Sequence, residues 1–149
     1  MLGDLAAARS EEQIVTVFRR SARAIAGADG ITMIRREGER VHYIAEDAIG
    51  PLWSGQDFPI EACISGIAIL ENRPIIIPDI YADPRVPIEA YRPTFVRSMA
   101  MLPIGHSAPK WAMGAYWSTT GVPAEEAMTL LGSLARAAAS SFESFERKG

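Results

Sequence analysis

The chain has 149 residues, 48% of them hydrophobic and 22% charged, with a formal net charge of −3. This length suits a single domain with one buried core. The 15 basic residues are interspersed with 18 acidic ones, which argues against nucleic acid as a partner, because phosphate binding needs an excess of Lys and Arg. No apolar run approaches the roughly 20 residues that cross a bilayer, and the N-terminus lacks the pattern of a signal peptide. We therefore expect a cytoplasmic protein.

The first half of the chain predicts a helix followed by short strands. Ser10 and Gln13 form a capping box, and apolar residues then keep helical spacing as far as Gly27, which is suited to a C-terminal cap. Further on, Gly and Pro separate short apolar runs. In chain order we expect a helix over residues 10–26, strands over 31–35 and 41–45 with a five-residue link between them, and an extended piece at 58–60.

The second half predicts a mixture of the same elements. Its apolar runs are bounded by Pro, Gly and Asp, and the last one keeps helical spacing to near the end of the chain. We expect a buried helix over 66–72, a strand over 74–77, a loop with a short helix over 79–94, strands over 99–104 and 110–118, and a final helix from Pro123 to about Glu146. This order predicts an α+β domain built on an antiparallel sheet.

The stretch from Arg73 to Ile104 resembles a known family. An apolar run ends at Pro78–Asp79, an Asp-Pro step follows at Asp83–Pro84, and a second apolar run begins at Met99. Together with the preceding FPIEACISGIAILENRP, this resembles a GAF domain, and it is most similar to the GAF sensory domains of bacterial HWE-type sensor histidine kinases. The resemblance covers about residues 10–146 and makes residues 1–149 a single domain. It implies a PAS-related fold, with five or six antiparallel strands, the N- and C-terminal helices on one face and a loop-covered pocket on the other.

Aromatic residues gather in the loops and in the strands beside them, as they do around ligand pockets. An ordinary core has the same composition, so both interpretations stay open. If the last strand alternates, one of two sets faces the helices and the other faces the pocket: Trp111, Met113, Ala115 and Trp117, or Ala112, Gly114, Tyr116 and Ser118. Gly114, opposite the loop, would leave room for a ligand or for close backbone packing. The candidate ligand-binding residues are Trp53, Phe58, Cys63, Asp79, Tyr81, Tyr91, Phe95, Ser98 and Tyr116.

Several of these residues also have simpler explanations. Cys63 stands at the start of a predicted helix, which can lower a thiol pKa, but a lone cysteine is more often a buried hydrophobe. Asp79 and Asp83 suit turn formation better than acid–base chemistry. The arginines that bracket the loop helix could bind an anion or simply be solvated, and these are Arg85, Arg92 and Arg97.

The family resemblance also limits the cofactors. One GAF subfamily reduces free methionine sulfoxide with several cysteines in relay, and the bilin-binding GAF domains of phytochromes carry a cysteine followed by a histidine. A single Cys63 matches neither pattern. We expect no covalent bilin, no haem and no zinc site, since His42 and His106 are far apart in sequence and have no matching Cys or carboxylate cluster nearby. The identity of any cofactor stays open.

The final helix carries a heptad-like seam. Ala127, Leu131, Leu134, Ala138, Ser141 and Phe145 recur at intervals of three and four residues. The seam predicts an apolar face that covers the sheet, a homodimer helix that relays a signal, or both. The residues assigned to the dimer or signal helix are Leu131, Leu134, Ala138 and Phe145.

These observations predict a sensory or regulatory GAF domain without chemistry of its own. We expect the input module of a sensor histidine kinase, which binds an unidentified small molecule, forms a homodimer and acts on a kinase or other output domain. A ligand-free dimerisation or spacer module is the alternative. An enzyme that uses Cys63 is a distant third, and it would need an accessible thiol of low pKa beside a base.

Overall fold

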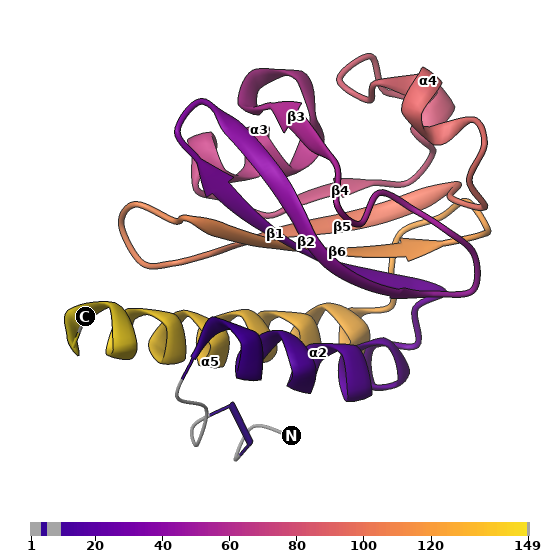
Figure 1. Ribbon diagram of the computed structural model, residues 1–149. Coiled ribbons are helices and arrows are strands. Elements are labelled where there is room, and N and C mark those ends of the chain that lie inside the picture. The colour runs from indigo at the N-terminus through magenta and orange to yellow at the C-terminus, as the bar shows by residue number, and fades with distance from the viewer. Residues whose placement is uncertain (1–3, 6–9, 149) are drawn as a thin grey trace.

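The computed structural model describes residues 4–5 and 10–148, and the side chains up to residue 144. Within this part of the chain, six strands form one antiparallel sheet in the order β3-β2-β1-β6-β5-β4 (Figure 1). The strands are β1 (Gly30–Glu37), β2 (Arg40–Ala48), β3 (Asp57–Pro59), β4 (Ile75–Ile77), β5 (Ser98–Ile104) and β6 (Trp111–Trp117). The predicted α+β class and antiparallel sheet are confirmed.

Helices cover both faces of the sheet. On one face lie α2 (Glu11–Ala26) and α5 (Glu125–Lys148), and on the other α3 (Ile64–Glu71), α4 (Ile88–Tyr91) and the short 3-10 turns η1 (Ile60–Ala62) and η2 (Ile80–Ala82) (Figure 1). We call these the helix face and the loop face. The predicted placement of the first and last helices on one face is confirmed. None of the described helices is both long and apolar enough to cross a membrane.

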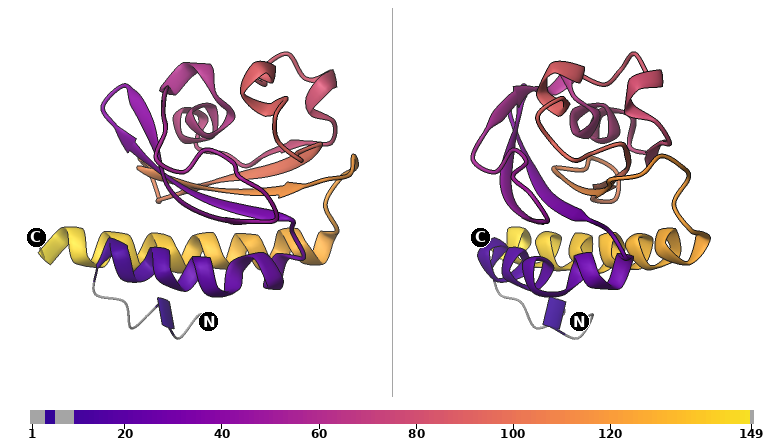
Figure 2. Two further views of the ribbon diagram at one scale, coloured as in Figure 1. Left: turned by 45° about the vertical axis from the view of Figure 1, so that its right-hand side comes forward. Right: turned by 90° about the vertical axis from the view of Figure 1, so that its right-hand side faces the viewer.

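The helix face holds a mostly aliphatic core. α2 and α5 lie side by side across the strands (Figure 2). Alternate residues of the central strands point into this core, among them Ile31, Met33 and Met113. The ring of Trp111 stacks on Phe142 of α5, with ring centroids 4.0 Å apart. One apolar stripe on each helix is therefore enough to cover this face.

The ends of α2 follow from its capping residues. The Oγ of Ser10 accepts a hydrogen bond from the backbone N–H of Gln13 at 3.2 Å. At the other end Gly27 takes a left-handed conformation with φ of 64°, which a glycine adopts without steric cost. This lets the N–H groups of Gly27 and Ala28 bond to the last free carbonyls of the helix.

Some element boundaries differ from the prediction. β1 ends at Glu37 and β2 begins at Arg40. The link between them is therefore the two-residue turn Gly38–Glu39, and not the five residues that were predicted. The prediction ended each strand with its apolar pattern, but backbone pairing continues through the charged residues at the rim. α3 begins two residues early, at Ile64, and α5 begins at Glu125, so Pro123 precedes the last helix instead of opening it.

A β-bulge at Ile44 decides which residues of β2 share a face. The pairing of β1 with β2 shifts between Met33 and Ile34, so that Ile34 lies opposite Tyr43 while Met33 lies opposite Ala45. An extra residue in one strand reverses the alternation of side chains beyond it. As a result Tyr43 and Glu46, three residues apart, both point to the loop face.

Candidate functional site

Five hydrogen-bonding side chains meet inside the apolar core of the loop face. The hydroxyl of Tyr116 lies 2.9 Å from Oγ1 of Thr32, and that of Tyr43 lies 3.2 Å from Oγ of Ser65. The Sγ of Cys63 lies 3.4 Å from the same Ser65 oxygen. All five are buried, and we call them the hydroxyl cluster. Among the described residues, no buried side-chain nitrogen or oxygen lacks a hydrogen-bond partner.

The indole of Trp53 covers this cluster. Its ring centroid lies 4.6 Å from that of Tyr91, 5.4 Å from that of Tyr116 and 5.6 Å from that of Tyr43. Its Nε1–H donates to the backbone carbonyl of Ala90 in α4 at 3.0 Å. Tilted and edge-on contacts of this kind suit the charge distribution of aromatic rings. Trp53 thus fills the space where the predicted pocket would lie and joins two loops across it.

A single carboxylate holds the loop that carries Trp53. Residues 49–56 connect β2 to β3, and we call them the Trp53 loop. The two oxygens of Glu46 accept hydrogen bonds from the backbone N–H groups of Leu52 and Ser54, at 2.9 and 2.8 Å. Hydrogen bonds to a charged acceptor are stronger than neutral ones. Glu46 therefore holds the backbone of the Trp53 loop, while the carbonyl of Ala90 holds the indole of Trp53.

Burial keeps the groups of the cluster uncharged. Loss of hydration raises the pKa of Tyr43, of Tyr91 and of Tyr116, and the neighbouring phenols raise it further for Tyr43 and Tyr91. Burial also raises the pKa of the Cys63 thiol, against a smaller opposing effect of its hydrogen bond to Ser65. At neutral pH the cluster therefore offers neutral donors and acceptors, and Cys63 is neither exposed nor activated.

The structure brings together most of the predicted site residues. Trp53, Cys63, Tyr91 and Tyr116 are buried in the core of the loop face, and Phe58 borders it, with its ring 5.5 Å from that of Tyr43. Phe95 is half-buried at its edge.

Three predicted residues lie elsewhere. Ser98 is buried, but it pairs with Trp117 on the helix face and donates to the carbonyl of Thr119, so its assignment to this site is wrong. Ser98 comes directly before Met99, whose side chain points to the loop face, and successive side chains of a strand point to opposite faces. Asp79 accepts a hydrogen bond from the N–H of Tyr81, as expected of a turn residue. Tyr81 is 52% exposed, and neither residue belongs to the core of the loop face.

The expected room beside Gly114 is already filled. The strand alternates as predicted, with Trp111 and Met113 toward the helices and Tyr116 toward the loops. A Cβ built on Gly114 would collide with the hydroxyl of Tyr116 and with Oγ1 of Thr32. The glycine therefore makes room for the cluster itself, and not for a ligand.

The arginines around the loop helix are paired within the chain. Arg85 binds both oxygens of Asp83, at 3.0 and 2.7 Å, and this contact lowers the pKa of the Asp83 carboxyl. Arg92 binds Glu89 at 2.9 Å. The guanidinium of Arg97 lies 5.3 Å from the ring centroid of Tyr81, a cation–π distance. These contacts agree with solvent-facing roles and do not form an anion site.

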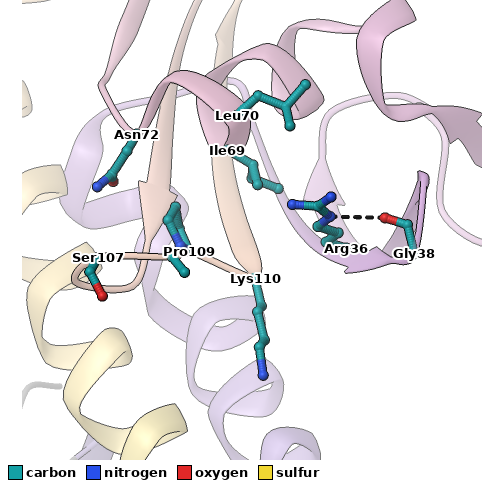
Figure 3. Close-up of a pocket in the computed structure, with 9 residues that line it drawn as sticks. Arg36, Gly38, Ile69, Leu70, Asn72, Ser107, Pro109 and Lys110 are labelled. Carbon is teal, nitrogen blue, oxygen red and sulfur yellow. Dashed lines mark hydrogen bonds between the residues drawn. The ribbon is translucent and has the colours of Figure 1, made fainter.

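An open cleft of about 490 Å³ lies at the other end of the loop face, between the end of α3 and two hairpins (Figure 3). It holds none of the predicted site residues. Two cationic residues line the cleft. The guanidinium of Arg36 donates to the carbonyl of Gly38, and the side chain of Lys110 extends away from Leu70 (Figure 3). The two cations do not converge, so the cleft has the shape but not the focused charge of a site for an anionic ligand.

The heptad-like seam of α5 lies in the chain's own core. Leu131, Leu134 and Ala138 have exposed fractions of 0%, 3% and 0% against the sheet and α2. The prediction that this face covers the sheet is confirmed. The side chain of Phe145 lies outside the described residues. The three buried residues could contact a second copy of the chain only if they left this core.

Sequence reasoning missed Thr32, Tyr43, Ser65 and Glu46. Thr32 and Tyr43 stand in predicted strands and Ser65 stands directly before a predicted helix, where a polar residue in an apolar run was the available signal. Nothing local distinguishes Glu46 from a solvated acid, because its role depends on the bulge and on a loop that returns to it.

Solved structures of other proteins share this fold, although the sequence itself has no detectable match. No protein-family model matches the sequence, and no curated protein is significantly similar to it. The GAF domain of a phosphoenolpyruvate-protein phosphotransferase from Coxiella burnetii has a TM-score of 0.83 at 16% identity, over 99% of this chain and 90% of that one. The GAF domain of a two-component sensor histidine kinase from Bacillus halodurans gives 0.79 at 16%, over 95% and 99%. Free methionine-R-sulfoxide reductase from Neisseria meningitidis, solved with its substrate, gives 0.80 at 16%, over 99% and 87%. Identities this low establish a shared fold alone.

Proposed function

Because this chain has the GAF fold, we propose that it is a sensory or regulatory domain that responds to a small uncharged ligand at the hydroxyl cluster. The observation that carries the proposal is the cluster itself. Ligand sites are mostly apolar with a few placed polar groups, and the core of the loop face has that character around Tyr43, Ser65 and Tyr116. Neutral hydroxyls favour a ligand that exchanges hydrogen bonds without bringing charge.

In the closed arrangement Trp53 occupies the place of such a ligand. Binding would therefore displace the indole and open the Trp53 loop, at the cost of its bond to Ala90 and of its ring contacts. The hydrogen bond contributes about 1 kcal/mol net and each ring contact roughly 0.5–1.5 kcal/mol, so a ligand must replace several kcal/mol of lost contacts to open the loop. A ligand shifts the equilibrium only by its difference in affinity for the two forms.

The strands offer a short route from the cluster to the helices. Thr32 and Tyr116 lie on β1 and β6, and the residues beside them on the same strands point into the core against α2 and α5. At the end of β6, the indole of Trp117 donates to the carbonyl of Gly27, which caps α2. A shift of β1 or β6 is thus passed directly to the helix pair.

The finer assignment is the cytoplasmic input domain of a sensor histidine kinase. In it, two copies would pair through their helix faces and a kinase or other output domain in the parent protein would respond. The likeness to the histidine kinase GAF domain from Bacillus halodurans supports this choice. We propose no catalysis by the domain itself, because Cys63 is buried and its pKa is raised.

A ligand-free dimerisation or spacer module is the second candidate. The packing of Trp53 against three tyrosines favours it, because a filled core needs no ligand to be stable.

Native mass spectrometry of the protein purified from a bacterial host would test the proposal. We expect a mass increment that disappears on denaturation, is reduced in Thr32→Val and persists in Ser98→Ala. The control removes a buried hydroxyl of similar size from the helix face. An unliganded species at twice the chain mass in all three proteins, also after addition of a metabolite extract, would favour the spacer module instead.

A further inference from the structure

Three metal-ligating side chains from neighbouring strands meet at one corner of the sheet. Glu37 ends β1, His42 lies in β2 and Asp57 begins β3, and one ligand atom from each lies within 4.8 Å of the other two. The Nδ1 of His42 contacts Oδ1 of Asp57 directly and lies 3.9 Å from Oε2 of Glu37. The sequence predicts no zinc site because no carboxylate cluster stands beside His42 in the chain, and here strand pairing brings the two carboxylates to it.

Backbone pairing holds the three residues in place. His42 stands opposite Asp57 in the pairing of β2 with β3, and it stands opposite Arg35 in the pairing with β1, two residues before Glu37. Side chains two residues apart share a face, so all three project from the helix face of the sheet. They lie beyond the start of α2, whose first residue, Glu11, contacts Arg35. The arrangement therefore does not depend on loop conformation.

The chemistry of the group suits a divalent transition metal. Imidazole nitrogen and carboxylate oxygen are both zinc ligands, and cobalt accepts the same donors. Bonds of about 2.0–2.2 Å to one ion require ligand atoms roughly 3–3.5 Å apart, which these side chains reach by small rotations. Two carboxylates would offset the charge of the ion. Arg35, 3.6 Å from Glu37, is shared with Glu11, and Arg40 stands opposite Glu37 in the strand pairing. The three carboxylates of this corner therefore outnumber its two guanidinium groups by one.

We propose that Glu37, His42 and Asp57 form a binding site for a divalent transition-metal ion, with zinc as the best match. Three protein ligands leave at least one position for water or for a group from another molecule. The ion would join the edge strand β3 to β2. The residue after Asp57 is Phe58, which packs on Tyr43, so occupancy would also stiffen one wall of the hydroxyl cluster.

An ordinary surface ion pair is the competing explanation, and such pairs contribute little. The chain offers an internal control for it, because its other histidine, His106, faces a single carboxylate, that of Glu143, at 3.3 Å. If one acid beside a histidine were enough, both histidines would bind metal alike.

The test is a titration of the full chain, without a polyhistidine tag, with zinc followed by calorimetry and thermal unfolding, and with cobalt followed by visible absorption. We expect one equivalent to bind and, at a free zinc concentration about 100 times Kd, a rise in melting temperature of roughly 5–10 °C. The rise and the cobalt bands should be lost in His42→Ala and reduced in Asp57→Asn, and kept in His106→Ala.

Three results would overturn the assignment. These are no heat and no shift in melting temperature for the unaltered chain at millimolar zinc, an undiminished response in His42→Ala, or an equal loss in His106→Ala. If His42→Ala does not fold, Asp57→Asn decides the question, because it keeps the shape of the side chain at an exposed position. An undiminished response there would likewise count against the site.

Discussion

The two faces of the sheet use buried polar groups in different ways. On the helix face, the hydroxyls of Ser98 and Ser141 donate to backbone carbonyls, at 2.7 and 2.6 Å. On the loop face, Thr32 and Ser65 bond instead to other side chains, namely to tyrosines. A hydroxyl that donates to a backbone carbonyl within a packed layer has no alternative hydrogen-bond partner beside it. Hydroxyls that bond to one another can change partners, and this difference locates the candidate site on the loop face.

The largest effect should come from the helix face. Phe142→Ala removes a fully buried ring that stacks on Trp111, so we expect a loss of about 3–5 kcal/mol in the free energy of unfolding. Ser140→Ala, an exposed position on the same helix, should change it by less than about 0.5 kcal/mol. Urea denaturation measures both. Equal effects would mean that α5 does not cover the sheet as described.

Glycines on the two faces should respond to alanine with opposite sign. A Cβ on Gly66 of α3 would strike the backbone of Ile60, so Gly66→Ala should destabilise the protein by about 1–3 kcal/mol. On α5, the nearest atom to a Cβ on Gly132 is the end of the Arg136 side chain at 3.4 Å. Gly132→Ala should therefore stabilise by about 0.5–1 kcal/mol through helix propensity. Thermal unfolding distinguishes the two signs.

The loop face should open more easily than the helix face. Trp53→Phe keeps an aromatic ring but loses the bond to Ala90, and Glu46→Gln weakens the acceptor for Leu52 and Ser54. We expect each to cost about 1 kcal/mol and to speed amide exchange in the Trp53 loop roughly fivefold.

The control for the loop is Glu39→Gln, whose side chain is 85% exposed in the Gly38–Glu39 turn. Exchange in the Trp53 loop should be unchanged in this variant. Unchanged exchange in Glu46→Gln as well would show that the carboxylate does not hold the loop.

The smallest effect should be the pH dependence that the loop face confers. Burial raises the pKa of Cys63, so the unfolded chain loses this proton first as pH rises. The contribution of the neutral thiol is complete below its unfolded pKa, near 8.5, and is lost as pH rises toward the folded value. Between pH 7 and 9 the loss should stay under about 1 kcal/mol, and Cys63→Ala should flatten it. A stability that rose over this range would contradict the burial of the thiol.

The resemblance to GAF domains was correct for the fold, and the predicted site was correct in part. Trp53, Tyr91 and Tyr116 were chosen as aromatic residues in loops and neighbouring strands, and they do meet. Ser98 was misplaced because a strand's start was not known to within one residue, and one residue changes the face. The partners of the tyrosines, Thr32 in a strand and Ser65 in a helix, were missed because neither residue carries a local sign of which hydroxyl it will meet.

By itself the sequence determined the order of the elements and the apolar face of each helix, because caps and periodicity are local properties of the chain. Tertiary structure alone decided which polar residues become neighbours. The bulge at Ile44 places Tyr43 and Glu46 on one face, and strand pairing gathers Glu37, His42 and Asp57 from three segments. Register depends on contacts between strands that are distant in sequence, and no single segment encodes it.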